Sequence, residues 1–178
     1  MSTILANAFY NHLSNDCYIN DLYISYTFKK CRLEPCKYID LFQFHNIKSL
    51  EELDFVMGDE GGLKALKEVK AKGIIKEIVI TSHMPEVLDK AMDTGEFATI
   101  QCPYNPVERQ AEEVFRKANK LDIGVIVMKP LAGGAIQNTD LSLRFITNNP
   151  NVTVAIPGMD SVKQVMENAK IGEKIIPL

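Results

Sequence analysis

Apolar blocks alternate with helical patterns from Tyr38 onward, and this alternation limits the chain to folds built around a parallel sheet. Five blocks are predicted strands, at residues 38–44, 77–81, 98–102, 125–128 and 152–156. Helices are predicted at residues 63–72, 85–94, 108–121, 139–149 and 162–170. Strands that are apolar throughout, each followed by a helix, indicate parallel strands covered by helices. The sequence therefore predicts an α/β fold, either a (β/α) barrel or an open doubly wound sheet.

Residues at the helix ends support these assignments. Gly73 suits a left-handed position after a helix, Pro85 suits a first helical position, and Gly95 suits the end of the helix that Pro85 begins. Thr139 and Ser161 are predicted N-caps, because a hydroxyl there accepts a hydrogen bond from a free backbone N–H. Before Tyr38 the pattern is weaker, with one possible strand at residues 22–26 and one or two helical turns at residues 28–33.

Composition excludes several classes of protein. The net charge of -3 and the pI of about 5.7 argue against a nucleic-acid-binding protein. No apolar run approaches the ~20 residues of a membrane span, and Met1–Tyr10 lacks the Lys and Arg of a signal peptide. With His12, His45 and His83 as the only histidines and no Cys-x-x-Cys spacing, no metal site is expected. Four reduced cysteines suit a cytoplasmic protein.

Polar residues follow the predicted strands at their carboxyl ends. They are His45–Asn46, Thr81–Ser82–His83, Gln101, Asn105, Lys129 and residues 158–161. In a barrel of parallel strands, chemistry takes place at this end. No G-x-G-x-x-G motif follows any strand, which weighs against a dinucleotide-binding open sheet. The pattern therefore favours the barrel and predicts a site at the carboxyl ends of its strands.

Four segments carry a resemblance to a known enzyme family. They are residues 38–46 (YIDLFQFHN), 101–106 (QCPYNP), 127–134 (VMKPLAGG) and 156–159 (IPGM), with Glu167–Asn168 following at the family's spacing. From about Phe28 to Asn168 the chain resembles the aldo-keto reductases, most closely the branch that often carries an iron-sulfur domain after the barrel. The resemblance implies a TIM barrel, of which the chain matches the last five of the eight strands. It divides the chain into an unmatched segment, residues 1–27, and a partial barrel, residues 28–178.

The resemblance also implies an activity and a set of site residues. The activity is reduction of a small-molecule aldehyde or ketone by hydride transfer from the reduced form of NADP or NAD. His45 matches the family's catalytic histidine, which polarises the carbonyl. Gln101, Thr81 and Ser82 match the residues that hold the nicotinamide carboxamide. Met128 stands where many members place a ring that stacks on the nicotinamide.

The same resemblance places the rest of the cofactor in the last two loops. Leu131 and Gly133 match the loop that approaches the pyrophosphate, and Glu167 and Asn168 match residues that face the adenine. Many relatives hold the adenosine 2′-phosphate with Lys, Ser and Arg, where this chain has Gly158, Met159 and Gln164. Because those charge-assisted contacts are lost, we expect little preference for NADP over NAD, with Lys163 as the only nearby cation.

The family's catalytic Asp, Tyr and Lys find no counterpart in residues 1–27. We therefore expect a truncated enzyme with no measurable carbonyl reduction. The alternatives are a non-catalytic nucleotide-binding or interaction protein, or the product of a truncated gene. A five-stranded sheet also has two open edges, beside residues 38–44 and 152–156, which favour a homodimer.

Overall fold

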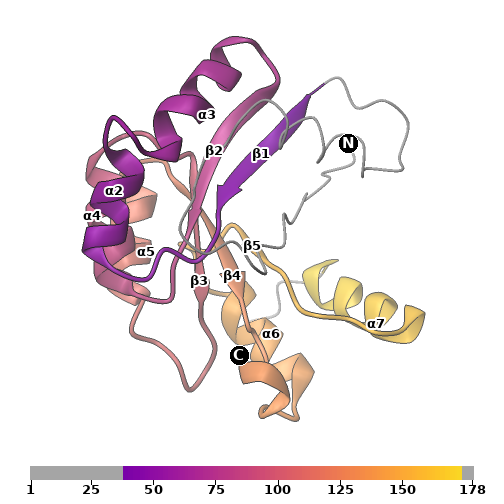
Figure 1. The fold of residues 1–178 in the computed structure, drawn as a ribbon. Helices are drawn as coiled ribbons and strands as arrows, with labels where there is room; N and C mark the ends of the chain where they lie inside the picture. Colours follow the sequence, from indigo (N-terminus) through magenta and orange to yellow (C-terminus); the bar gives the residue numbers. More distant parts are fainter. Residues whose placement is uncertain (1–37, 174–178) are drawn as a thin grey trace.

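The computed structural model describes residues 38–173, and these form one parallel sheet with the strand order β1-β2-β3-β4-β5 (Figure 1). The strands are β1 (Ile39–Phe44), β2 (Ile75–Thr81), β3 (Thr99–Pro103), β4 (Gly124–Met128) and β5 (Val154–Ala155). Each strand pairs with its successor in the sequence. A doubly wound sheet reverses this order at a switch point, whereas a barrel wall does not. The sequential order therefore selects the barrel-type α/β architecture, and the prediction of five parallel strands is confirmed.

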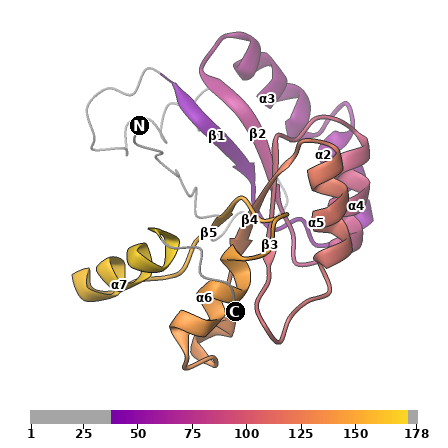
Figure 2. The same ribbon diagram turned by 180° about the vertical axis from the view of Figure 1, so that it is seen from behind.

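Helices follow each of the first four strands. They are α2 (Leu50–Met57) and α3 (Gly62–Ala71) after β1, α4 (Pro85–Asp93) after β2, α5 (Glu112–Lys120) after β3, and the short helix η1 (Ala132–Gly134) with α6 (Thr139–Thr147) after β4. The last helix, α7 (Val162–Glu173), follows β5. Helices α2 to α5 lie together on one side of the sheet, α6 lies next to β5, and α7 packs against α6 (Figures 1 and 2).

The core lies between the sheet and the helices α2 to α5. Ile80 of β2, Leu66 of α3, Leu88 of α4 and Phe115 of α5 are completely buried there. Apolar residues recur at helical spacing in the predicted helices at residues 63–72 and 108–121, and the structure buries them: Leu63, Leu66, Val69, Ala111, Val114, Phe115 and Ala118. These side chains fix the sheet against its outer layer, so that the carboxyl ends of β1 to β4 share one edge.

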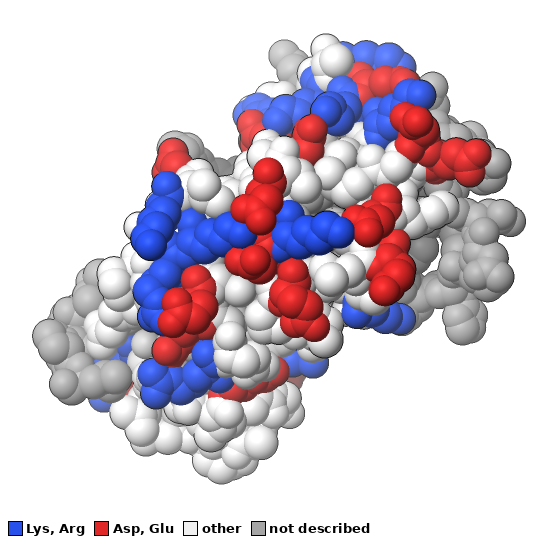
Figure 3. Space-filling view, turned by 90° about the vertical axis from the view of Figure 1, so that its left-hand side faces the viewer, with Lys and Arg blue, Asp and Glu red and all other residues white. Residues whose placement is uncertain are grey.

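Acidic and basic residues intermingle on the outer surface of this layer, as Figure 3 shows. Lys90 of α4 pairs with Asp54 of α2 at 2.7 Å. Lys117 of α5 reaches two carboxylates of α4, Asp89 at 3.0 Å and Asp93 at 2.7 Å. A nucleic-acid-binding face requires a basic patch or stripe, and the surface over helices α2 to α5 presents none.

Several predicted helix ends are confirmed. Pro85 is the first residue of α4, Gly95 with φ +70° follows its C-cap, and Gly73 with φ +73° follows the C-cap of α3. The Ser161 hydroxyl accepts a hydrogen bond from the Gln164 N–H at 3.2 Å. The prediction for Thr139 was wrong, because the Asn138 side chain accepts from the Leu141 N–H at 3.0 Å and Thr139 becomes the first helical residue.

The structure also differs from the prediction at α2, α5 and β5. Helix α2 was not predicted, and α5 begins at Glu112 rather than at residue 108, because Asn105 and Glu108 pair their backbones in a tight loop. Strand β5 has two residues rather than five, although the Thr153 and Ile156 N–H groups still donate to the β4 carbonyls at 3.0 and 2.9 Å. The predicted strand at residues 22–26 and helical turns at residues 28–33 lie outside the described residues. Within residues 38–173, none of the helices is long and apolar enough to cross a membrane.

Candidate functional site

The first four strands bring predicted site residues to one edge of the sheet. His45 follows the end of β1 and is exposed, whereas Thr81 at the end of β2 is 1 % exposed. Thr81 pairs in register with Gln101 of β3, and Pro103 of β3 pairs with Met128 of β4. Phe44 pairs with Ile80, so His45 emerges beside the end of β2. The structure therefore gathers these four predicted residues at the carboxyl ends of neighbouring strands.

Two buried polar groups in this cluster are poorly satisfied. The Gln101 amide nitrogen contacts the Met128 sulfur at 3.5 Å, and a thioether is a weak acceptor. The Thr81 hydroxyl is buried and has no hydrogen-bond partner among the described residues. Buried polar groups are normally paired, so this pair suits a ligand that offers both a donor and an acceptor. A carboxamide has that composition, and the residues present therefore fit the nicotinamide end of NADH or NADPH.

Ser82 has a structural role that the sequence analysis did not foresee. Its hydroxyl is completely buried, donates to the Ile47 carbonyl at 2.6 Å and accepts from the Met84 N–H at 3.0 Å. These bonds hold the turn after β2 against the segment that follows β1. The Ser82 oxygen therefore has one lone pair left to accept a hydrogen bond from a cofactor. The cofactor contact of Ser82 stays a prediction.

The loop after β4 adopts left-handed backbone conformations at several positions. The φ angles are +52° at Lys129, +48° at Ala132, +68° at Gly133 and +96° at Gly134. A Cβ atom placed on Gly133 or Gly134 would meet nothing within 4 Å, so backbone conformation and not crowding requires these glycines. The Gly134 N–H donates to the Leu131 carbonyl at 2.8 Å, which closes the turn. The glycines remain exposed, and their backbone is open to an approaching ligand.

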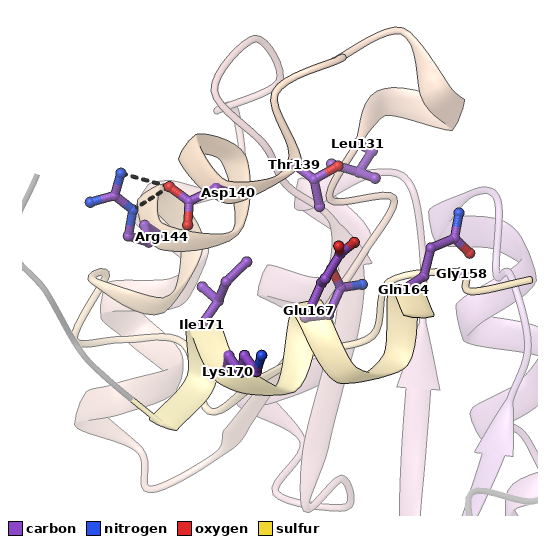
Figure 4. Close-up of a pocket in the computed structure, with 10 residues that line it drawn as sticks. Leu131, Thr139, Asp140, Arg144, Gly158, Gln164, Glu167, Lys170 and Ile171 are labelled. Atoms are coloured by element: carbon purple, nitrogen blue, oxygen red, sulfur yellow. Dashed lines mark hydrogen bonds and ion pairs between the residues drawn. The ribbon is translucent and has the colours of Figure 1, made fainter. Parts of the chain in front are cut away.

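A pocket of about 670 Å³ lies between this loop, α6 and α7 (Figure 4). It is lined by four residues predicted to bind the cofactor, namely Leu131, Gly158, Glu167 and Asn168, and also by Gln164. Glu167 points from α7 into the space below Thr139 and Leu131. Residues from three separate segments that were assigned to the pyrophosphate, the 2′-phosphate and the adenine thus line one cavity.

The cations of this pocket differ from the prediction. Lys163 does not line it, and its ammonium lies 3.8 Å from Glu167 with the side chain 82% exposed. Lys170 and Arg144 line the pocket instead. Arg144 is held by Asp140, through its Nε at 2.9 Å and a terminal nitrogen at 2.7 Å. The prediction that Lys163 is the only nearby cation was wrong for this pocket. Lys163 and Lys170 both lie at helical spacing from Glu167, so the sequence alone does not choose between them.

A second group of charges surrounds His83, which follows β2. The pKa of His83 lies below its ordinary value, first because of partial burial and second because of the Lys129 ammonium. Glu108 acts in the opposite direction, and His45 adds to the lowering. A neutral His83 is thereby favoured near neutral pH. In the described part of the chain, no three His, Cys, Asp or Glu side chains form a group that could hold a metal ion.

Comparisons with known proteins agree with this architecture. The model of the aldo/keto reductase family matches residues 29–141, which is more than half of the chain. The chain is 22% identical over 132 residues to an uncharacterised oxidoreductase of Bacillus subtilis, YqkF, and covers 41% of its length. Among solved structures, the holo form of the aldo-keto reductase AKR11C1 from Bacillus halodurans superposes with a TM-score of 0.74 at 20% identity. The match covers 88% of this chain and 59% of AKR11C1.

A thermostable aldo-keto reductase, Tm1743, solved with the inhibitor epalrestat, gives a TM-score of 0.69 at 20% identity, over 87% of this chain and 60% of that protein. The chain therefore belongs to the aldo/keto reductase family. It spans about two fifths of the length of YqkF and about three fifths of these solved relatives. Members of this family are oxidoreductases that generally use NADH or NADPH.

Proposed function

We propose that the chain binds a nicotinamide dinucleotide along the carboxyl ends of β2 to β5 and contributes this site, with His45, to a cytoplasmic enzyme that reduces small-molecule aldehydes or ketones. The observation that carries the proposal is the Thr81 hydroxyl, which has no hydrogen-bond partner within residues 38–173 and lies beside the Gln101 amide. Both groups belong to a buried polar pair at the edge where the family places the nicotinamide. Without a ligand, this arrangement only costs stability.

Each end of the cofactor has residues that suit it. Thr81 and Gln101 would hold the carboxamide, and Met128 would cover a face of the ring with an adaptable apolar side chain. The loop at Leu131 and Gly133 would lie against the pyrophosphate with its backbone. Glu167 and Asn168 would face the adenine in the pocket beneath α6. These assignments follow one path from the sheet to α7.

His45 would act on the substrate. Its imidazole is exposed at the end of β1, next to the end of β2, where a carbonyl oxygen can reach it. Donation of a hydrogen bond from this imidazole polarises the carbonyl, and stabilising charge on that oxygen is a large component of catalysis. A bound reduced nicotinamide supplies the hydride. The proton donor is a separate group, which the sequence analysis did not match in residues 1–27.

Both cofactors are expected to bind with similar affinity. Gly158, Met159 and Gln164 lack a positive charge for a 2′-phosphate, and Asp140 occupies the guanidinium of Arg144. Lys170 is the pocket cation for which no ion pair is recorded among the described residues. A single exposed lysine adds little to phosphate binding compared with a bidentate arginine. NADPH should therefore bind no more than a few times better than NADH.

Fluorescence titration with NADH and with NADPH tests the proposal. We expect Gln101→Ala to weaken both by roughly tenfold, which corresponds to about 1.4 kcal/mol. Gln110→Ala is the matched control, because Gln110 is exposed and its side-chain amide hydrogen-bonds only to Glu108 among the described residues. Failure of the unaltered protein to bind either cofactor would contradict the proposal. A tenfold preference for NADPH would contradict the assignment of the pocket cations.

A second candidate function is nucleotide binding without catalysis. His45 is the only one of the family's four catalytic residues that the sequence matches. Cofactor binding without turnover of simple aldehydes would favour this candidate. Turnover that is lost in His45→Ala would favour the reductase.

Self-association through the sheet edges is a further expectation. Within the described residues β1 pairs only with β2, β5 pairs only with β4, and Val154 of β5 is 42% exposed. An unpaired edge is a template for another strand, so we propose a homodimer. Light scattering should give twice the chain mass at high protein concentration. A monomeric mass over the whole concentration range would exclude the dimer.

A further inference from the structure

Two consecutive carbonyls at the start of the loop after β4 each accept a hydrogen bond from a buried side chain. The Asn105 amide nitrogen donates to the Lys129 carbonyl at 3.1 Å. The Ser142 hydroxyl donates to the Pro130 carbonyl at 2.6 Å. Asn105 and Ser142 are both completely buried. The loop is therefore attached on one side to the end of β3 and on the other side to α6.

Asn105 is itself held rigidly. Its side-chain oxygen accepts from the Val107 N–H at 3.1 Å, and its amide nitrogen also donates to a Glu108 carboxylate oxygen at 3.2 Å. Its backbone N–H and carbonyl both pair with the backbone of Glu108, at 3.2 and 3.1 Å. A buried amide with this many partners has one orientation. The donor that reaches Lys129 is thus held in place by contacts outside the loop at residues 129–134.

The loop needs such support because its own backbone provides little at this point. Lys129 has a φ of +52°, which is unfavourable for a residue with a side chain. Pro130 has no N–H to donate. The first backbone bonds inside the loop run from the Ala132 N–H to the Lys129 carbonyl at 3.0 Å and from the Gly134 N–H to the Leu131 carbonyl. The Lys129 carbonyl therefore joins the Asn105 side chain to the first turn.

We infer that Asn105 and Ser142 are positioning residues that hold the loop at residues 129–134 in the conformation that presents Leu131 to the pocket and the Gly133 backbone to the cofactor pyrophosphate. The identity of the ligand in this inference rests on the proposed function. The conformation of the loop is independent of that function and can be measured without any ligand.

Two variants remove one attachment each, and two controls match them. Asn105→Asp keeps the side-chain shape and the acceptor for Val107 but removes the donor to the Lys129 carbonyl. It also removes the donor to Glu108 and sets an acceptor oxygen against that carboxylate, so Ser142→Ala is the cleaner of the two variants. Asn149→Asp makes the same chemical change where the amide contacts the Tyr104 hydroxyl and the Asn151 N–H. Ser142→Ala removes the donor to Pro130. Thr147→Ala removes a hydroxyl of the same helix that bonds only within α6, to the Leu143 and Arg144 carbonyls.

Hydrogen exchange of the ligand-free protein gives the first readout. We expect amides of residues 131–136 to exchange on the order of tenfold faster in Asn105→Asp and in Ser142→Ala, with the sheet amides unchanged. The two controls should leave this loop as it is, and Ser142→Thr, which keeps the hydroxyl, should restore slow exchange. Unchanged loop exchange in Ser142→Ala would overturn the inference even if Asn105→Asp failed to fold.

Cofactor affinity gives the second readout. NADH should bind roughly tenfold more weakly to Ser142→Ala than to Thr147→Ala when both are folded, and Ser142→Thr should recover the affinity. Faster loop exchange with unchanged NADH affinity would overturn the positioning role. If the unaltered protein binds no dinucleotide, the proposed function fails, and the exchange data alone decide whether the two side chains hold the loop.

Discussion

Gly61→Ala is expected to lower the free energy of unfolding by about 3 kcal/mol, at the upper end of what overpacking normally costs. Gly61 precedes α3, and a Cβ atom there would lie 2.2 Å from the Phe55 carbonyl oxygen and 2.3 Å from the Val56 carbonyl oxygen. Both atoms belong to the backbone of α2, so no side-chain rotation can make room. Either α2 or α3 must shift, and the shift disturbs the contacts that Leu53 and Leu66 make in the core.

Gly58→Ala is the matched control for this substitution. Gly58 lies in the same connection between α2 and α3, but its Cβ would meet the nearest atoms at 3.4 Å, an ordinary van der Waals distance. Neither glycine has a positive φ, so backbone conformation does not distinguish them. Urea unfolding followed by circular dichroism measures both variants. A Gly61→Ala protein as stable as Gly58→Ala would show that the helices separate at little cost.

The elements that could be predicted from the sequence are those whose burial pattern is regular. Leu63, Leu66 and Val69 lie at helical spacing because α3 has one buried side. The apolar blocks of β1 to β4 are recognisable because these strands contribute buried residues to the core. Helix α2 breaks this regularity. Phe55 is 55% exposed and Leu50 37% exposed, whereas Leu53 and Val56 are buried, so apolar residues occur on both sides of a helix of eight residues.

Helix and strand ends were less predictable where two local solutions compete. Asn138 and Thr139 are both good N-caps, so residue preference alone does not choose between them, and in the structure Asn138 takes this position. The apolar block at residues 152–156 predicted a strand of five residues, but β5 lies at the edge of the described sheet and pairs on one side only. Its length is therefore set by one neighbour and by the turn at Asn149, whose carbonyl accepts from the Val152 N–H at 3.0 Å.

The candidate site shows a similar division. The resemblance identified Thr81, Gln101 and Glu167 by their motifs, and the structure places them at one edge of the sheet and in the pocket beside it. The resemblance did not identify Arg144 or Lys170 as pocket residues, because the pocket that they line forms only when α6 packs beside α7. That the Thr81 hydroxyl has no partner among the described residues is likewise a property of packing, since the same Thr at an exposed strand end would be hydrated.

Thr81→Val is expected to change stability and cofactor binding in opposite directions. The two side chains have nearly the same shape and both suit a strand, but valine lacks the buried hydroxyl that has no partner in the described structure. Removing an unsatisfied buried polar group should raise the free energy of unfolding by about 1 kcal/mol. If this hydroxyl holds the carboxamide, NADH should bind roughly tenfold more weakly, a loss of about 1.4 kcal/mol.

Thr99→Val separates the two effects. The Thr99 hydroxyl is also buried and has no partner in the described part of the chain, but Thr99 begins β3, at the end of the sheet opposite to the candidate site. Its substitution should give a similar gain in stability and leave NADH affinity unchanged. Urea unfolding and fluorescence titration of the same samples provide both measurements. Equal NADH affinity in the two variants would remove Thr81 from the cofactor site, and a loss of stability in Thr81→Val would mean that its hydroxyl is already satisfied. Higher stability with weaker NADH binding in Thr81→Val, and higher stability alone in Thr99→Val, is the result expected if the Thr81 hydroxyl binds the ligand.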